Sequence, residues 1–163
     1  MALMEITEFP ERVLKEAGGP VEKFDGELER LVADMFETMY GEEGVGLAAP
    51  QVGLSLRLFV MDCEGIRLVA ANPEILSAEG EQGGEEGCLS VGKIHAPLKR
   101  PARVRLRAQD VEGRWFEREA EGLAARCFLH ETDHCDGLLF IDRLSPLRRD
   151  MVKRRFQKMR KWR

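Results

Sequence analysis

Two histidines lie four residues apart in this chain, in the segment His130-Glu-Thr-Asp-His134. Residues at this spacing lie one turn apart on the same face of a helix, so both imidazoles can converge on one metal ion, with Glu131 beside a water on that metal. The face continues in apolar residues, which indicates that the histidines point inward, where an unpaired imidazole would be costly. This argues against the alternative of a solvated helix that carries two histidines and a glutamate. The sequence therefore predicts a helix with a buried metal site.

A catalytic tetrahedral site needs three protein ligands and an open position. The segment after the motif is dominated by arginine and lysine, and of its nearest acids, Asp136 and Asp142, the second lies in an apolar turn that we interpret as structural. Cys88 is the better third ligand, because it follows a glycine that allows close approach and because binding would convert its thiol to a thiolate. Cys127, one turn before His130, is typical of a wall or core position.

The composition fits one globular domain over residues 1–163, with 44% apolar and 33% charged residues. No apolar run approaches the roughly 18 residues of a membrane-spanning helix, and the start lacks the basic-then-apolar order of a signal peptide. We therefore expect a cytoplasmic protein without a membrane segment. Four cysteines are too few for a disulfide scaffold at this length, so each is core filler or a ligand.

Apolar spacing predicts three helices. The first covers residues 25–40, with Asp25 as its N-cap, and the second covers about 119–136 and carries the histidine motif. The third, over 146–163, is strongly basic. Together with two hairpins, these helices predict an α+β fold, in which antiparallel β-sheets pack around the central metal-binding helix, with an N-terminal helix and a basic C-terminal helix.

The first hairpin pairs residues 56–61 with 66–71, and the second pairs 103–109 with 114–119. Aspartate and glycine at the ends of each connection predict type I turns. In residues 103–108 arginines alternate with apolar residues, which is the period of a half-buried antiparallel strand.

Two glycine-rich segments are predicted to be loops. Residues 44–53 cannot form a regular core element, and their glycines suit a backbone that approaches another group closely. Residues 79–86 are expected to form a mobile acidic surface loop that leads into Cys88.

Three motifs in this order resemble the peptide deformylase family: Gly44-Val-Gly-Leu-Ala-Ala-Pro-Gln51, Glu86-Gly-Cys-Leu-Ser90 and the histidine motif. The likeness extends over nearly the whole chain, through the N-terminal segment and Arg100-Pro101. It implies a metal-dependent amide hydrolase that removes the N-formyl group from the N-terminal methionine of newly made polypeptides and releases formate.

The resemblance also implies roles by position. The metal ligands would be Cys88, His130 and His134, the acid/base Glu131, and the oxyanion donors Gln51 and the backbone N–H of Leu89. The substrate-binding residues would be Val45, Gly46, Glu86, Leu123, Arg126 and Cys127.

This sequence departs from the family pattern at two positions. Arg126 stands where an apolar residue is common, so either its stem covers the pocket while its head reaches water, or the pocket is shaped differently. Gly92 stands where proline commonly follows the second motif, which alters the expected geometry after Ser90.

One thiolate and two imidazoles suit Zn²⁺, Fe²⁺, Ni²⁺ or Co²⁺, and the resemblance implies one Fe²⁺ per chain. An ion pair between Asp133 and Arg100 is predicted to fix the motif helix to the Cys88 segment, the alternative being a solvated helix acid.

From Arg148 onward the chain holds nine Lys/Arg against one acid, which suits either a solvated helix face or contact with an anionic surface. The resemblance implies that this helix contacts the ribosome near the exit of the nascent chain. An apolar stripe of Val152, Phe156, Met159 and Trp162 is predicted to pack on the body of the protein.

Two alternatives belong to other classes. One is a metal-dependent endopeptidase, against which Cys88 as a ligand argues. The other is a ribosome- or RNA-binding domain with a structural metal, for which a closed site with four ligands would be expected. Gln51 and the glycine loop have no use in a structural site and favour the deformylase hypothesis.

Overall fold

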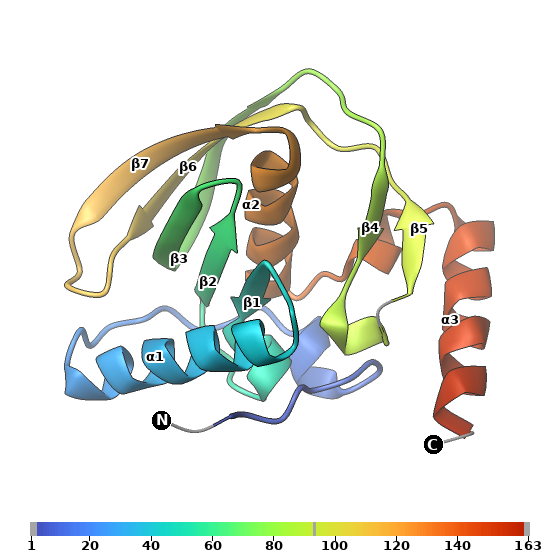
Figure 1. Ribbon diagram of the computed structural model, residues 1–163, viewed down its shortest axis with the longest axis horizontal. Helices are drawn as coiled ribbons and strands as arrows, with labels where there is room; N and C mark the ends of the chain where they lie inside the picture. The colour runs from blue at the N-terminus through green and yellow to red at the C-terminus, as the bar shows by residue number, and fades with distance from the viewer. Residues whose placement is uncertain (1–2, 93, 162–163) are drawn as a thin grey trace.

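The computed structural model describes residues 3–92 and 94–161 (Figure 1). The α-helices of this part of the chain are α1 (Gly26–Gly41), α2 (Gly122–Cys135) and α3 (Pro146–Lys161). The strands are β1 (Gly46–Ala48), β2 (Leu58–Cys63), β3 (Ile66–Glu79), β4 (Glu85–Gly87), β5 (His95–Pro97), β6 (Arg103–Gln109) and β7 (Trp115–Glu121). Four 3-10 turns join them, η1 (Arg12–Lys15), η2 (Ala49–Val52), η3 (Leu89–Val91) and η4 (Phe140–Arg143).

The mixed helix and antiparallel-sheet architecture is the one expected from the sequence. Five strands form one sheet in the order β1-β2-β3-β6-β7, and β4 pairs with β5 in a separate two-stranded sheet. Helix α2 lies between these two sheets (Figure 1). Among the described residues no helix is both long and apolar enough to span a bilayer.

Strand β2 is buried on both faces. Phe59 and Met61 join the core around α2, whereas Leu58 and Val60 join the core beneath α1. This explains why its sequence is a continuous apolar run. Helix α1 begins as predicted, because the Asp25 side chain accepts a hydrogen bond from the Leu28 N–H at 3.1 Å.

Strand β6 confirms the alternation seen in the sequence. Its apolar residues Val104, Leu106 and Ala108 are buried against α2, and its arginines point away from the core. The predicted turn after β6 also forms, with the Gly113 N–H donating to the Asp110 carbonyl at 2.9 Å.

The turn of the first hairpin differs from the prediction. Cys63 and Ile66 pair directly, and the two residues between them, Glu64 and Gly65, have φ of 54° and 79°. Two positive φ values define a type I′ turn, whose twist matches that of the flanking strands. The prediction of a type I turn is therefore wrong here.

Two predicted boundaries are also wrong. Residues 119–121 continue β7 and pair with β6, so the motif helix begins only at Gly122. Residues 44–53 are not wholly irregular, because Gly46–Ala48 forms an edge strand paired with β2. In both places a neighbouring strand supplies hydrogen bonds that local sequence does not reveal.

The acidic segment at 79–86 lies at the surface as predicted, since residues 79–81 and 83–85 are exposed, but it is paired with another segment and is not a free loop. Glu79 ends β3, the Gln82 backbone exchanges two hydrogen bonds with Arg100, and Glu85 begins β4. Glu86 is buried with 4% of its surface exposed. Pairing with the segment 95–100 therefore orders residues that composition alone marks as mobile.

Helix α3 packs on the body through part of the predicted stripe. Val152 and Phe156 are buried in a core shared with η4 and the segment after Cys88, while Met159 is 39% exposed. Trp162 lies outside the described residues. Gly92 has a φ of +61°, and a Cβ there would approach the Phe156 ring at 3.0 Å, which accounts for glycine at this position.

Candidate active site

Cys88, His130 and His134 converge on one buried point. Cys88 precedes η3, and the two histidines lie one turn apart on α2. Their ligand atoms all lie within 4.8 Å of one another, and the Cys88 Sγ is 3.3 Å from the His134 Nε2. A thiolate and two imidazoles form a suitable donor set for a transition metal.

One buried polar atom beside the cluster supports the presence of a further group here. The Glu131 Oε1 has no hydrogen-bond partner among the described residues. Buried polar atoms are seldom left unpaired, so this oxygen indicates that the site takes up a further group. Together with the donor set, it fits a metal ion with a water beside Glu131.

The carboxylate of Glu86 orients His130. Its Oε2 lies 2.7 Å from the His130 Nδ1, which leaves the Nε2 of that ring free to bind a metal. Burial raises the pKa of Glu86, but hydrogen bonds from His130 and Arg100 outweigh it and hold that pKa well below its usual range. Glu86 is thus a permanent carboxylate in the interior.

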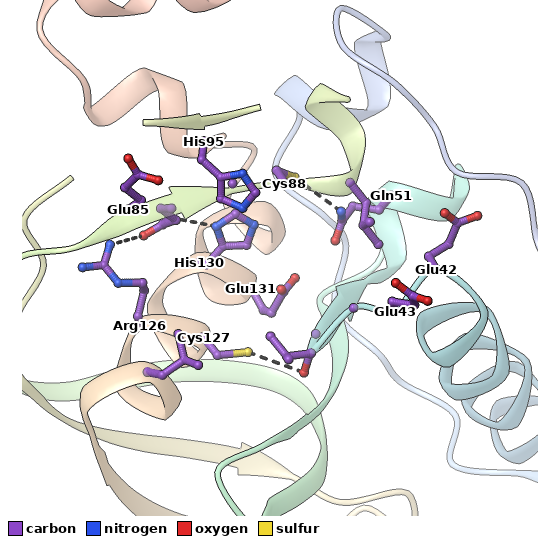
Figure 2. Close-up of a pocket in the computed structure, with 17 residues that line it drawn as sticks. Glu42, Glu43, Gln51, Glu85, Cys88, His95, Arg126, Cys127, His130 and Glu131 are labelled. Carbon is purple, nitrogen blue, oxygen red and sulfur yellow. Dashed lines mark hydrogen bonds and ion pairs between the residues drawn. The ribbon is translucent and has the colours of Figure 1, made fainter. Parts of the chain in front are cut away.

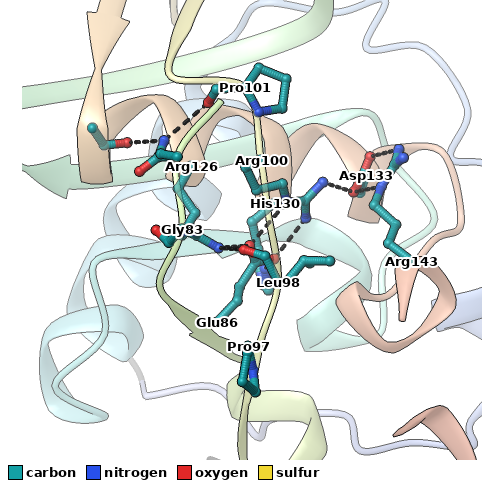
Figure 3. Close-up of polar contacts among 12 residues, drawn as sticks. Gly83, Glu86, Pro97, Leu98, Arg100, Pro101, Arg126, His130, Asp133 and Arg143 are labelled. Carbon is teal, nitrogen blue, oxygen red and sulfur yellow. Dashed lines mark hydrogen bonds and ion pairs between the residues drawn. The ribbon is translucent and has the colours of Figure 1, made fainter. Parts of the chain in front are cut away.

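The predicted ion pair between Arg100 and Asp133 is confirmed, with 3.0 Å between the Nη1 and the Oδ2. Arg143 also binds Asp133, through its Nε at 2.7 Å and its Nη2 at 2.8 Å (Figure 3). Arg143 is a site residue that was not predicted from the sequence, where its position soon after the histidine motif is the only signal of this role. These contacts join α2 to the Cys88 segment and to η4.

Glu131 lies beside the ligand cluster (Figure 2). Burial raises its pKa to about 7, the charge on His130 lowers it, and Glu86 raises it. Gly46 packs directly on this side chain, because a Cβ there would lie 2.6 Å from the Glu131 Oε2 and 2.8 Å from the Cys127 Sγ. Glycine at position 46 is therefore explained by the acid itself, before any substrate is considered.

The amide of Gln51 points toward Cys88. Its Oε1 accepts a hydrogen bond from the Ala48 N–H at 3.0 Å, and its Nε2 lies 3.5 Å from the Cys88 Sγ. The Nε2 also donates to the Ser90 hydroxyl at 3.3 Å. The backbone bond fixes which end of the amide faces the cluster.

A cavity of about 390 Å³ opens beside the cluster. It lies between the segment 44–46, strand β4 and helix α2 (Figure 2). Val45 and Leu123 contribute half-exposed apolar side chains, with 44% and 47% of their surfaces accessible. Four further lining residues lie outside the predicted site residues, namely Glu42, Glu43, Glu85 and His95. Two of them, Glu43 and Glu85, directly precede a motif.

Arg126 lines the cavity, but its head does not reach water. The residue is 5% exposed, and its guanidinium donates to Glu86 and to the backbone carbonyls of Gly83 and Leu98. The part of the first expected geometry that places the head of Arg126 in water is therefore wrong. Cys127 is a buried wall residue as predicted, and burial raises the pKa of its thiol.

Comparison with known proteins identifies the family. The polypeptide deformylase family model matches residues 3–150. This chain belongs to the polypeptide deformylase family. The peptide deformylase of Acidobacterium capsulatum is 47% identical over 166 residues, which cover 99% of this chain and 98% of that protein. The peptide deformylase of Alkalilimnicola ehrlichii is 48% identical over 163 residues, covering 98% and 92%.

Solved structures agree with the assignment. The crystal structure of a peptide deformylase from Legionella pneumophila superposes with a TM-score of 0.94 at 46% identity, covering 99% of this chain and 97% of that one. The deformylase described here is thus a metal-dependent hydrolase that removes the N-formyl group from newly made polypeptides. The endopeptidase and RNA-binding alternatives are set aside by the same match.

Proposed function

We propose that this deformylase binds one divalent metal through Cys88, His130 and His134, and that Glu131 is its acid and base. The observation that carries the proposal is the convergence of three ligand atoms within 4.8 Å, beside a buried carboxylate oxygen that has no protein partner. When bound, the metal would supply Lewis acidity and lower the pKa of a water.

The chain's own groups then act on the formyl amide. Glu131 takes a proton from the attacking water and later returns it to the leaving amine of the methionine. The Gln51 Nε2 and the Leu89 N–H donate hydrogen bonds to the formyl oxygen as it gains negative charge. Each such donor contributes about 3 kcal/mol to transition-state stabilisation in comparable sites.

The substrate lies as an extended peptide along the segment that contains Val45 and Gly46. Strand β1 is at the edge of its sheet, so one side of it is available for pairing with a peptide backbone. The methionine side chain enters the cavity against Leu123, Cys127 and the stem of Arg126. Glu86 lines the same cavity, and its carboxylate acts there by holding His130.

The metal in the cell is proposed to be Fe²⁺, with Zn²⁺, Ni²⁺ and Co²⁺ as ions that the same donors can hold. We further propose that the enzyme acts in the cytoplasm on nascent chains and contacts the ribosome near their exit through α3. The exposed arginines and lysines of this helix support that contact, because they suit the phosphates of rRNA.

The deciding experiment measures formate release from formyl-Met-Ala-Ser by anaerobically purified protein loaded with Fe²⁺. We expect activity in the parent and a loss of at least about 100-fold in Glu131→Ala, since general acid–base catalysis contributes 10²–10⁴-fold. Metal content is measured in both proteins, and Glu117→Ala, on the exposed strand β7, serves as the control. A metal-loaded parent without formate release would contradict the proposed reaction, and a fully active Glu131→Ala would contradict the assigned base.

A further inference from the structure

The proposed metal ligands come from two separate parts of the molecule. Cys88 directly follows a ribbon formed by residues 82–87 and 95–100, which contains β4 and β5, whereas both histidines lie on α2. The site therefore exists only if the ribbon and the helix are held at a fixed separation. Errors of about 1 Å in such positions are enough to impair a site.

Arg126 lies on α2 one turn before His130 and contacts both strands of the ribbon. Its Nη2 donates to the Gly83 carbonyl at 3.0 Å on the first strand, and its Nη1 donates to the Leu98 carbonyl at 2.9 Å on the second. The Leu98 N–H in turn donates to the Gly84 carbonyl at 3.0 Å. The guanidinium therefore binds the ribbon where its two segments are hydrogen-bonded to each other. One planar side chain thus joins the helix to both strands.

The same guanidinium completes the surroundings of Glu86. The Glu86 Oε1 accepts from the Arg126 Nη1 and from the Arg100 Nε, both at 3.0 Å. The Oε2 accepts from the Arg100 Nη2 at 2.7 Å and faces the His130 Nδ1 at 2.7 Å (Figure 3). Contacts on Oε1 therefore set the direction in which Oε2 meets the metal-binding ring.

From these contacts we infer that Arg126 is a positioning residue for the metal centre, which holds α2 against the ribbon and holds Glu86 against His130. This inference rests on the metal ligands proposed above. The Arg126 guanidinium donates to the side chain of Glu86, so Arg126 acts on the metal ligand His130 through that carboxylate. The residue also lines the cavity, and its charged head serves the metal site.

Arg126→Met separates these two roles, because methionine keeps an apolar stem and removes all of the N–H donors. Glu86 stays paired with Arg100 in this variant, so the buried carboxylate is not left alone. Arg126→Lys keeps the charge but not the planar fork, and we expect partial rescue. Arg105→Met is the matched control, because Arg105 pairs with Glu117 at 2.9 Å on the exposed face of the sheet.

The test measures Co²⁺ affinity and the visible absorption spectrum of the bound Co²⁺, with urea unfolding of each apoprotein as a separate readout. We expect Co²⁺ affinity to fall by about tenfold in Arg126→Met, the low end of the 10–100-fold range for residues behind a metal ligand, together with a changed spectrum. The fall should be smaller in Arg126→Lys and absent in Arg105→Met. For a formyl-Met peptide we expect kcat to fall while KM stays within about twofold.

Unchanged Co²⁺ affinity and spectrum in Arg126→Met would overturn the inference, even if that variant unfolds at lower urea. If Arg126→Met does not fold, Arg126→Gln, which is shorter and uncharged, is measured in its place, and parent-like Co²⁺ binding by that variant would overturn the inference as well. Metal binding is measured without substrate. A parent protein that binds Co²⁺ but releases no formate would therefore contradict the proposed reaction. The effect of Arg126→Met on Co²⁺ binding would still test the role of Arg126.

Discussion

At Glu86 a single buried carboxylate accepts hydrogen bonds from two arginines and meets one histidine. Its acceptor positions are filled from within the protein, so the side chain has little capacity left for a substrate. The resemblance to deformylases placed Glu86 among the substrate-binding residues. The contacts give its side chain the different task of fixing the ring of His130.

Gly46 allows a prediction at the same scale. In Gly46→Ala the new Cβ would lie 2.6 Å from the Glu131 Oε2, so the carboxylate must move. We expect formate release to fall by about 100-fold, the cost of a displacement of about 1 Å at a catalytic group. The rate of formate release per bound metal ion, in Gly46→Ala and in the parent, would measure this loss.

Gly26→Ala is the matched control, since Gly26 begins α1 and a Cβ there would meet only the Arg30 Nη1, at an ordinary distance of 3.7 Å. Equal activities of Gly46→Ala and the parent would show that Glu131 tolerates displacement or is not the acid/base.

At the scale of elements, the segment after Cys88 depends on its packing against α3. Gly92 ends η3 in the left-handed region, and the ring of Phe156 lies against it. Phe156 is fully buried together with Val91 and Phe140. The Cys88 segment is therefore held in place by packing against the C-terminal helix.

Gly92→Ala tests this support. We expect the free energy of unfolding to fall by about 2 kcal/mol, because a positive φ costs a non-glycine residue about 1 kcal/mol or more and the Cβ also crowds Phe156. Urea denaturation at constant protein concentration would measure it.

Gly65→Ala is the matched control, with a φ of +79° but nothing within 4 Å of its Cβ. Equal losses in the two variants would mean that backbone strain alone acts at Gly92 and that the contact with Phe156 contributes nothing.

At the scale of the whole molecule, charge is divided between an acidic body and the basic helix α3. Val152 and Phe156 of this helix are buried, so its removal would expose the core beneath it. The ribosome proposal is therefore tested better by changing charges on its exposed face than by truncation.

The triple variant Arg154→Glu, Arg155→Glu and Lys158→Glu changes three exposed positions of α3. We expect it to bind ribosomes more weakly than the parent, with a smaller dependence on salt, because fewer phosphates are neutralised. Activity on a short formyl peptide should stay within about twofold of the parent. Co-sedimentation at several salt concentrations would measure binding.

The control for co-sedimentation is the triple variant Lys23→Glu, Lys99→Glu and Arg118→Glu, which reverses three exposed positive charges outside α3. Equal weakening by both variants would indicate a general charge effect and contradict a specific role for α3.

Features that depend on local spacing could be predicted without the structure. The helical period places His130 and His134 on one face, the period of two residues orients the side chains of β6, and three motifs in order identify the family.

Contacts between segments that are distant in the sequence could be seen only in the tertiary structure. Local sequence predicts that residues 79–86 form an exposed loop, and it places a charged residue, Arg126, where an apolar pocket residue is expected. Pairing of that segment with residues 95–100 buries Glu86, and only then does the guanidinium of Arg126 have an acceptor. A buried charge is tolerated where a partner meets it, and the partner here lies 40 residues away in the chain.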